Sequence, residues 1–261
     1  MIEIKNCNVT FNANTINENK ALKDITLKLE DGDFVTVIGS NGAGKSTLLN
    51  VICGNISIDS GEVFIDNENV TKCKEHQRAK FIGRLSQDPL KGTAPHMTIE
   101  ENCLLAYGRG TNRKLCFSIS KEESKLFHDQ CAKLNLGLEN RMKAEVGLLS
   151  GGQRQALTLL MATMIPPHLL LLDEHTAALD PKTAENIMKL TDDIIQENKI
   201  TTLMITHNID HALKYGNKTI IMNEGRILDI IEGEKRSLMT KEDVMKYYEK
   251  IHGVLSDKQI L

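Results

Sequence analysis

FVTVIGSNGAGKST, at residues 34–47, is the stretch that decides the fold. Its apolar and β-branched start, from Phe34 to Ile38, predicts a buried strand, and the residues from Lys45 through about Cys53 predict a helix. Between them, Gly39-x-x-x-x-Gly44-Lys45-Ser46 has the spacing of a phosphate-binding loop. Because glycine lets the backbone approach a ligand closely, the N–H groups of this loop can surround phosphate oxygens at a helix N-terminus.

The phosphate-binding loop predicts which residues would hold a nucleotide. Lys45 is expected to place its charge on the β- and γ-phosphates, and Ser46 to offer its hydroxyl to Mg²⁺. A chance match in a glycine-rich turn is the alternative, and the strand–loop–helix context disfavours it. The predicted nucleotide-binding residues of the loop are Gly39, Ser40, Asn41, Gly42, Ala43, Gly44, Lys45, Ser46 and Thr47.

The composition excludes several classes of protein. The chain has 261 residues, enough for one large domain or two small ones, and its 41% apolar and 26% charged residues exclude a disordered chain. The net charge of −3, without a basic block, disfavours nucleic-acid binding. No stretch approaches the roughly 20 apolar residues of a membrane span, and the N-terminus lacks a signal-peptide pattern. Six cysteines without a CxxC pair argue against a zinc site or a disulfide scaffold and indicate free thiols in a reducing cytosol.

Alternating strand and helix patterns predict an α/β protein. Further strands are expected at 2–9, 25–29, 61–65, 168–173 and 201–206. Asp31-Gly32 indicates a hairpin turn between the strands at 25–29 and 34–38, and Asn223-Glu224-Gly225 indicates a second hairpin within 218–231. Residues from about 88 to 148 have helical periodicity and predict a mostly helical insert. A last helix is expected from Thr240, with Asp243 completing its capping box.

Two further segments carry candidate chemistry. Leu169 to Leu172 predicts a buried strand that ends in Asp173 and Glu174, so Asp173 could reach Mg²⁺ while Glu174 faces an attacking water. An ordinary acidic strand end is the alternative. Leu149-Ser150-Gly151-Gly152-Gln153 predicts a second anion-binding helix end, because Ser150 is a suitable N-cap and the two glycines expose backbone N–H groups; its helix is expected at about 155–165.

Taken together and in this order, the motifs resemble those of a nucleotide-binding subunit of a bacterial ATP-binding cassette (ABC) transporter. The resemblance covers about residues 2–231. It identifies residues 39–47 as the Walker A motif, Gln87 as the Q-loop, 149–153 as the signature motif and 169–174 as Walker B. It also identifies Ala178-Leu179-Asp180 as the D-loop and His207 as the switch histidine.

The resemblance implies a fold and a division of the chain. The fold would be an α/β P-loop NTPase (RecA-like) core with an antiparallel β subdomain and a helical insert subdomain. As a single ATP-binding domain over 1–261, the chain would have its core and β subdomain at 1–87 and 149–231. The helical subdomain would span 88–148, and a helical tail 232–261.

The resemblance also implies a role for each site residue. Two subunits would pack head to tail, with ATP between Walker A of one copy and the signature helix of the other. Glu174 would act as general base or polarise water, with His207 and Gln87 as the other catalytic residues. Mg²⁺ would be held by Ser46, Gln87 and Asp173. Outside the loop, the implied nucleotide-binding residues are Phe11, Ser150, Gly151, Gly152, Gln153 and Asp180.

Three positions depart from the family pattern or leave alternatives open. His175 stands where the family often has proline, and it could contact nucleotide, face solvent or pack structurally. Phe11 would stack on adenine in place of the usual tyrosine, or belong to the core. Ala177 stands where a D-loop serine is frequent.

The resemblance implies partners as well. ATP hydrolysis would drive a separate integral membrane permease, met by the surface between Gln87 and about Arg109, with the subunit cytoplasmic and peripheral on the membrane. The residues of several motifs are similar to those of cassettes that import an amino-acid-like solute. Such import would also involve an extracytoplasmic solute-binding protein. The alternative is a soluble non-transport cassette, such as an iron–sulfur cluster assembly ATPase. Residues of this chain do not identify the solute, because the solute contacts other chains.

Overall fold

The structure is a computed structural model that describes residues 1–109 and 119–252, with side chains described as far as Tyr247. Cys116 and the end of the expected C-terminal tail lie outside the described residues. The chain folds as two compact units, Met1–Arg78 with Thr201–Leu261, and Ala79–Ile200. These boundaries differ from the sequence-based division at 87 and 149, which stays a prediction.

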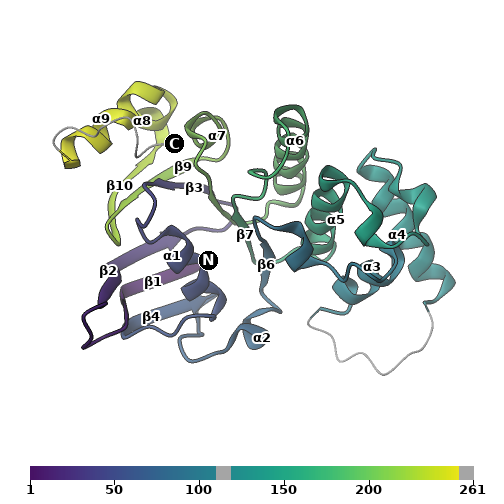
Figure 1. Ribbon diagram of the computed structural model, residues 1–261, viewed down its shortest axis with the longest axis horizontal. Coiled ribbons are helices and arrows are strands. Elements are labelled where there is room, and N and C mark those ends of the chain that lie inside the picture. The colour runs from purple at the N-terminus through teal and green to yellow at the C-terminus, as the bar shows by residue number, and fades with distance from the viewer. Residues whose placement is uncertain (110–118, 253–261) are drawn as a thin grey trace. The chain divides into compact units, whose positions relative to one another are not determined.

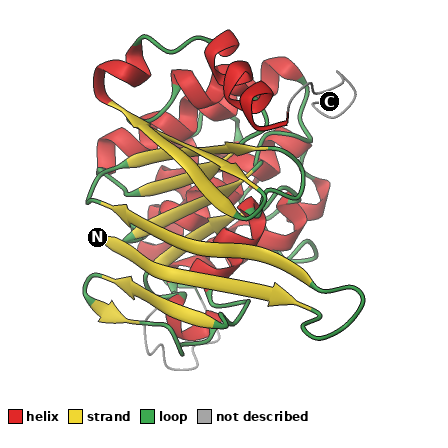
Figure 2. Ribbon diagram, turned by 90° about the vertical axis from the view of Figure 1, so that its left-hand side faces the viewer, coloured by secondary structure: helices red, strands yellow, loops and turns green. Residues whose placement is uncertain are grey.

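The first unit contains an antiparallel sheet in the order β2-β1-β4-β5. Its long strands β1 and β2 lie side by side (Figure 2). In β1, Ile2 and Ile4 are buried in alternation, and after an irregularity between Ile4 and Cys7 the alternation resumes with Cys7 and Val9 buried. The strands are β1 (Ile2–Phe11), β2 (Asn19–Leu29), β4 (Ser60–Ile65) and β5 (Glu68–Asn69).

The same unit contains four further strands in the order β10-β9-β3-β8. They are β3 (Phe34–Gly39), β8 (Thr202–Ile205), β9 (Lys218–Asn223) and β10 (Arg226–Glu232). Strand β3 runs parallel to both β8 and β9, and every residue of β3 and β8 is buried, as expected for apolar runs without alternation. The hairpin β9–β10 is confirmed, with both Glu224 and Gly225 at positive φ in its turn.

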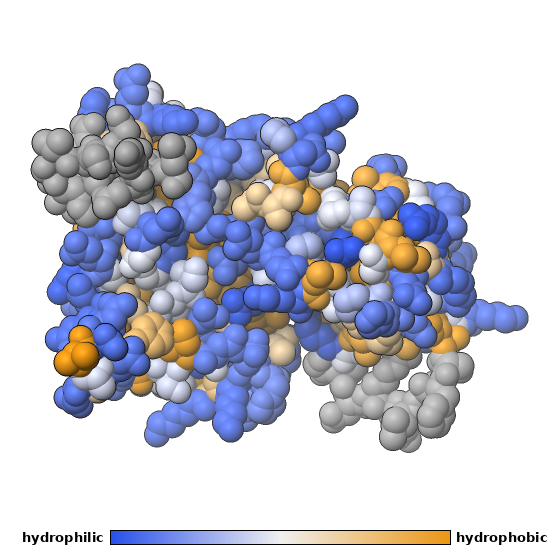
Figure 3. Space-filling model, viewed as in Figure 1, coloured by the Kyte–Doolittle hydropathy of each residue, from blue (hydrophilic) through white to orange (hydrophobic). Residues whose placement is uncertain are grey.

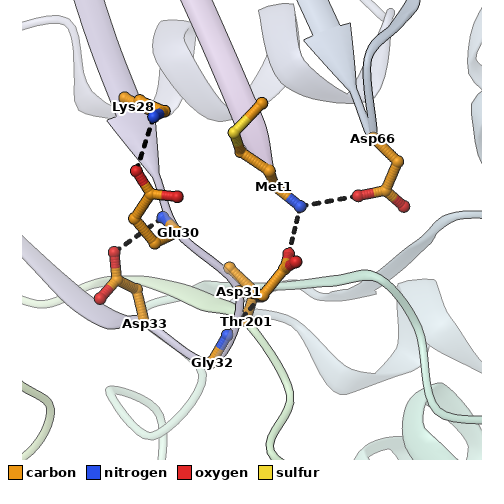
Figure 4. Close-up of polar contacts among 8 residues, drawn as sticks. All are labelled: Met1, Lys28, Glu30, Asp31, Gly32, Asp33, Asp66 and Thr201. Carbon is orange, nitrogen blue, oxygen red and sulfur yellow. Dashed lines mark hydrogen bonds and ion pairs between the residues drawn. The ribbon is translucent and has the colours of Figure 1, made fainter.

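The hairpin expected at Asp31-Gly32 is wrong. Strand β2 pairs with β1, whereas β3 pairs with β8 and β9, so this turn carries the chain from one sheet to another. Polar contacts hold the turn in place (Figure 4): the Met1 ammonium contacts Asp31 and lies 2.6 Å from Asp66, and the Gly32 N–H donates to Thr201 Oγ at 3.0 Å. A turn motif shows that the chain changes direction, but it carries no information about which strand will pair with which.

The helices of the first unit include one at its predicted position. Helix α1 (Lys45–Cys53) begins after Gly44 and ends before Gly54, both at positive φ. The capping box at the last helix is confirmed, because the Thr240 and Asp243 side chains accept each other's backbone N–H at 3.2 Å. The remaining helices are α2 (Glu75–Arg78), α7 (Ile209–Lys214), α8 (Gly233–Ser237) and α9 (Lys241–His252).

The second unit pairs two strands with a cluster of helices. Strands β6 (Ile82–Leu85) and β7 (Leu169–Asp173) are parallel. Figure 1 shows α3, α4 and α5 together, and their shared core contains Cys103, Phe127 and Leu157. The helices are α3 (Ile99–Tyr107), α4 (Lys121–Lys133), α5 (Gly151–Thr163) and α6 (Pro181–Asn198), with 3₁₀ turns η1 (Pro89–Gly92), η2 (Leu138–Arg141) and η3 (Val146–Leu148). The mostly helical character of 88–148 is confirmed for its described residues.

One face of the molecule can be seen side chain by side chain. The face seen in Figure 3 is largely hydrophilic, and its hydrophobic side chains form separate patches. Among the helices that the structure describes, none has both the length and the hydrophobicity needed to cross a membrane. The five described cysteines are free thiols.

Candidate nucleotide-binding site

The phosphate-binding loop lies between β3 and α1 and needs its glycines. A Cβ atom on Gly39 would approach the Met222 carbonyl oxygen to 2.4 Å, and one on Gly44 would approach the Ala21 carbonyl oxygen to 2.6 Å. Gly44 is also the N-cap of α1 at φ 95°, and no side chain caps this helix end. The N-terminus of α1 therefore keeps the form of an anion-binding helix end.

Lys45 lies folded over this loop. Its side chain is buried, with 6% of the residue exposed, and Nζ donates to the carbonyl oxygens of Gly39 at 2.7 Å and Ser40 at 3.0 Å. The positive charge is thus held at the loop where phosphates would lie. Ser46 is exposed on the first turn of α1.

Two more predicted residues belong to the same unit. His207 is exposed just after β8, and the neighbouring Asn208 caps α7 by accepting the His211 N–H at 3.1 Å. Phe11 is 37% exposed at the end of β1. A place in the core is therefore wrong for Phe11, and stacking on adenine stays a prediction.

In the second unit, β7 brings two carboxylates to the end of a buried strand. Residues 169–172 are fully buried, and Asp173 follows with a partly exposed side chain. Arg84 of the adjacent β6 places a guanidinium nitrogen 3.9 Å from the Asp173 carboxylate. Glu174 has left β7 and stands at φ 48°, in the left-handed region that non-glycine residues rarely adopt.

His175 is not at the surface. Only 2% of it is exposed, and its Nε2 lies 3.3 Å from Thr191 Oγ on α6. The solvent-facing interpretation is therefore wrong, and structural packing is what the structure shows. Sequence patterns could not reveal this, because the burial of a histidine depends on which helix covers it.

The signature segment forms a capped helix end. Ser150 Oγ accepts the Gln153 N–H at 3.3 Å, and Gln153 Oε1 accepts the Ser150 N–H at 3.2 Å. Helix α5 consequently begins at Gly151 rather than near 155, and it ends at Thr163. The capping box offsets the low helix propensity of the two glycines.

Sequence reasoning missed one residue beside this helix end. The Arg154 guanidinium donates to the carbonyl oxygens of Gly147 and Leu149, each at 3.0 Å, and so holds the turn that leads into Ser150. The signal that could have found it is a basic residue directly after the signature motif.

Asp180 and Gln87 lie at the edges of this unit. Asp180 caps α6 by accepting the Thr183 N–H at 3.1 Å, and hydrogen bonding from Thr183 lowers the pKa of its carboxyl. Gln87 is exposed between β6 and η1.

Comparison with known proteins shows which family the chain resembles. Residues 22–177 match the family described as ABC transporter, which is more than half of the chain. The chain belongs to the ABC transporter family. It is 42% identical over 248 residues to the tyrosine transport ATP-binding protein of Clostridioides difficile, covering 95% of this chain and 98% of that protein.

Solved cassettes have the same fold. A dimeric ATP-binding cassette in a post-hydrolysis state, bound to ADP and Pi, is 29% identical with a TM-score of 0.75 and covers 89% of this chain and 98% of its own. CbiO1 from Clostridium perfringens, described as part of the ABC transporter complex CbiONQ, is 26% identical with a TM-score of 0.74, covering 97% and 95%. The chain is accordingly an ABC ATPase with a P-loop NTPase fold, and it binds and hydrolyses ATP with Mg²⁺.

The residues predicted to hold Mg²⁺ have oxygen donors of the kind that this ion prefers. Ser46 carries a hydroxyl, Gln87 an amide and Asp173 a carboxylate, and hard oxygen ligands suit Mg²⁺ alongside phosphate oxygens and water, so each assignment stays a prediction. Among the side chains that the structure describes, in residues 1–109 and 119–247, no group of three or more His, Cys, Asp or Glu could hold a metal by itself.

Proposed function

We propose that this cassette powers the uptake of an amino-acid-like solute through separate membrane permease subunits. The observation that carries the proposal is the 42% identity, over nearly the full length of both chains, to a protein named for tyrosine transport. The described part of the chain has no helix suited to crossing a membrane, so the solute path would belong to other chains. The subunit would then be peripheral on the cytoplasmic face, with an extracytoplasmic solute-binding protein delivering the solute.

The proposed catalytic unit is a pair of identical chains packed head to tail. Each chain carries two anion-binding helix ends, at α1 and at α5. In the proposed pair, the loop of one copy binds ATP, and Ser150, Gly151 and Gly152 of the other copy contact its γ-phosphate. The dimeric solved relative supports this arrangement.

The chain's own residues divide the chemistry. Lys45 holds the β- and γ-phosphates. Ser46, Gln87 and Asp173 would hold Mg²⁺, whose charge would offset that of the phosphates. Glu174 orients the attacking water and accepts its proton. His207 hydrogen-bonds the γ-phosphate and keeps that geometry.

Three assignments complete the proposed site. Phe11 stacks on adenine, using an exposed ring face. Asp180, which caps α6, and Gln153, which completes the capping box of α5, are the remaining nucleotide-binding residues. Gln87, at the start of the helical segment, also reports nucleotide state to the permease.

The test is co-purification of the chain from native membranes, followed by identification of its partner chains. Recovery of a multi-span permease is expected, and the reconstituted complex should hydrolyse ATP faster when an aromatic amino acid is supplied with its binding protein. Recovery of iron–sulfur scaffold proteins without a permease would overturn the proposal. A permease complex that responds only to a solute of another class would overturn the substrate but leave the transport role.

A further inference from the structure

We propose that His175 is a positioning residue, which holds the backbone of Glu174 by tying the end of β7 to α6 through Thr191. The inference rests on the proposed role of Glu174 in hydrolysis. It concerns one of the positions at which this chain departs from the family pattern, a histidine where proline is frequent.

The conformation of Glu174 is the first observation. Its φ of 48° lies in the left-handed region, which costs a non-glycine residue about 1–2 kcal/mol. Such a residue keeps this conformation only when its neighbours enforce it. On one side, Leu172 is paired with Leu85 in the β6–β7 ladder; on the other, the Ala177 N–H donates to the Glu174 carbonyl oxygen at 2.9 Å.

The contact of His175 is the second observation. Its ring is buried, and Nε2 lies 3.3 Å from Thr191 Oγ. Thr191 is fully buried, and its hydroxyl donates to the Ile187 carbonyl oxygen at 2.7 Å. Because a hydroxyl has a single hydrogen, Thr191 Oγ must accept from His175, and the imidazole must carry a proton on Nε2.

The two observations concern adjacent residues, linked by one peptide bond. His175 directly follows Glu174, so fixing the imidazole against α6 fixes where the chain goes after Glu174. Residues Ile187, Met188, Thr191 and Ile195 form the buried face of α6, so the acceptor belongs to a packed element rather than to a loop. The hydrogen bond therefore aims the Glu174 side chain from outside the reaction itself.

The alternative roles of His175 require different properties of its ring. A residue that contacts nucleotide would need an accessible ring, which a 2% exposed side chain does not offer. A ring that only fills space would tolerate an apolar replacement of similar size. A positioning ring requires a donor at the place of Nε2, and that requirement can be tested.

The experiment compares four single variants of the purified cassette and one double variant. His175→Leu and Thr191→Val each remove one partner, and His175→Gln returns an amide N–H near the position of Nε2. Thr163→Val is the matched control, because Thr163 is also buried and donates to a carbonyl four residues earlier, Leu159, at 2.8 Å. Thermal unfolding shows which variants remain folded at the assay temperature.

We expect kcat to fall in some variants while their affinity for ATP stays nearly unchanged. His175→Leu and Thr191→Val should lower kcat about tenfold, which equals about 1.4 kcal/mol in the barrier, while the Kd for ATP stays within about twofold. His175→Gln should recover most of kcat, and Thr163→Val should keep it. The double variant His175→Leu/Thr191→Val should be no slower than the slower single variant, because both remove one contact.

Nuclear magnetic resonance of ¹⁵N-labelled histidine detects the contact between His175 and Thr191 and does not depend on ATP hydrolysis. The His175 ring should be protonated at Nε2 in the parent, and its Nε2 signal should shift in Thr191→Val. A ring protonated only at Nδ1, or an unchanged kcat in the double variant, would overturn the inference. If Glu174→Gln instead turns over like the parent, the role of Glu174 fails, while the ring signature and its response to Thr191→Val still report the contact.

Discussion

At the scale of single residues, Lys45 is the first test of the nucleotide site. Its Nζ is held by the Gly39 and Ser40 carbonyl oxygens, so the charge is already placed at the loop before ATP arrives. Lys45→Ala should weaken ATP binding at least tenfold, about 1.4 kcal/mol, measured by calorimetric titration. Lys28→Ala, which removes an exposed lysine paired with Glu30, is the control and should bind ATP normally. Equal affinity in Lys45→Ala and the parent would remove Lys45 from the site.

The pKa of the Asp33 carboxyl leads to a prediction of how the stability of the fold depends on pH. Burial raises the pKa of its carboxyl, but hydrogen bonds from Asn217, Lys218 and the Glu30 N–H outweigh burial and leave the pKa below the ordinary 3.8. The folded state therefore binds this proton less readily than the unfolded chain. Its stabilising contribution is complete above the unfolded pKa and is lost as the pH falls through the folded value.

The measurement is urea unfolding between about pH 7 and pH 2. Asp33→Asn should lower the free energy of unfolding by about 1–2 kcal/mol at pH 7, and the difference from the parent should shrink below about pH 4. Asp59→Asn, at an exposed aspartate, is the control. A difference that stays constant down to pH 2 would contradict the assignment.

At the scale of elements, α4 and α5 start with the same hydrogen-bond pattern. Ser150 with Gln153 at α5, and Ser120 with Glu123 at α4, each form a complete capping box. Ser150→Ala and Ser120→Ala should therefore each lose about 1 kcal/mol of stability in thermal unfolding. Only Ser150→Ala should also lose ATPase activity, because only its helix end is proposed to contact phosphate. Matched activity losses in both variants would mean that the cap at α5 is structural alone.

How far the sequence predicts an element depends on whether its determinants are local. Helix α1, predicted from Lys45 through about Cys53, lies at that position, and Gly44 and Gly54 at positive φ end it on both sides. The start of α5 was set too late, because the glycines weigh against helix while the capping box favours it. The partner of β2 was predicted wrongly, since strand pairing depends on residues far apart in the chain.

The residues of the candidate site also differ in how far the sequence predicts them. The phosphate-binding loop and its glycines are a local pattern, and the sequence located them completely. The contacts of His175 with Thr191 and of Arg154 with the turn before Ser150 arise from packing, and no spacing rule reveals them.

At the scale of the whole molecule, the head-to-tail pair makes the decisive prediction. With ATP and Mg²⁺ present, Glu174→Gln should hold uncleaved nucleotide and accumulate as a dimer of twice 29.1 kDa in light scattering. The physical reason is that ATP would bridge two surfaces that each lack half of the phosphate contacts. Lys45→Ala in the same background should stay monomeric, because it loses the nucleotide that joins the copies.

Crosslinking locates the joined surfaces. Asn41 is exposed in the loop, and a Cβ on Gly151 would meet only Leu179 at an ordinary 3.4 Å, so both positions accept cysteine. Chains carrying Asn41→Cys are mixed with chains carrying Gly151→Cys, with Cys73 and Cys116 replaced by serine in both. A short thiol crosslinker should join them only with trapped ATP, whereas Lys121→Cys, at the first residue of α4, should not react in place of Gly151→Cys. Because the permease could be needed to align two copies, the experiment is repeated on the complex purified from membranes, and failure there as well would contradict the shared site.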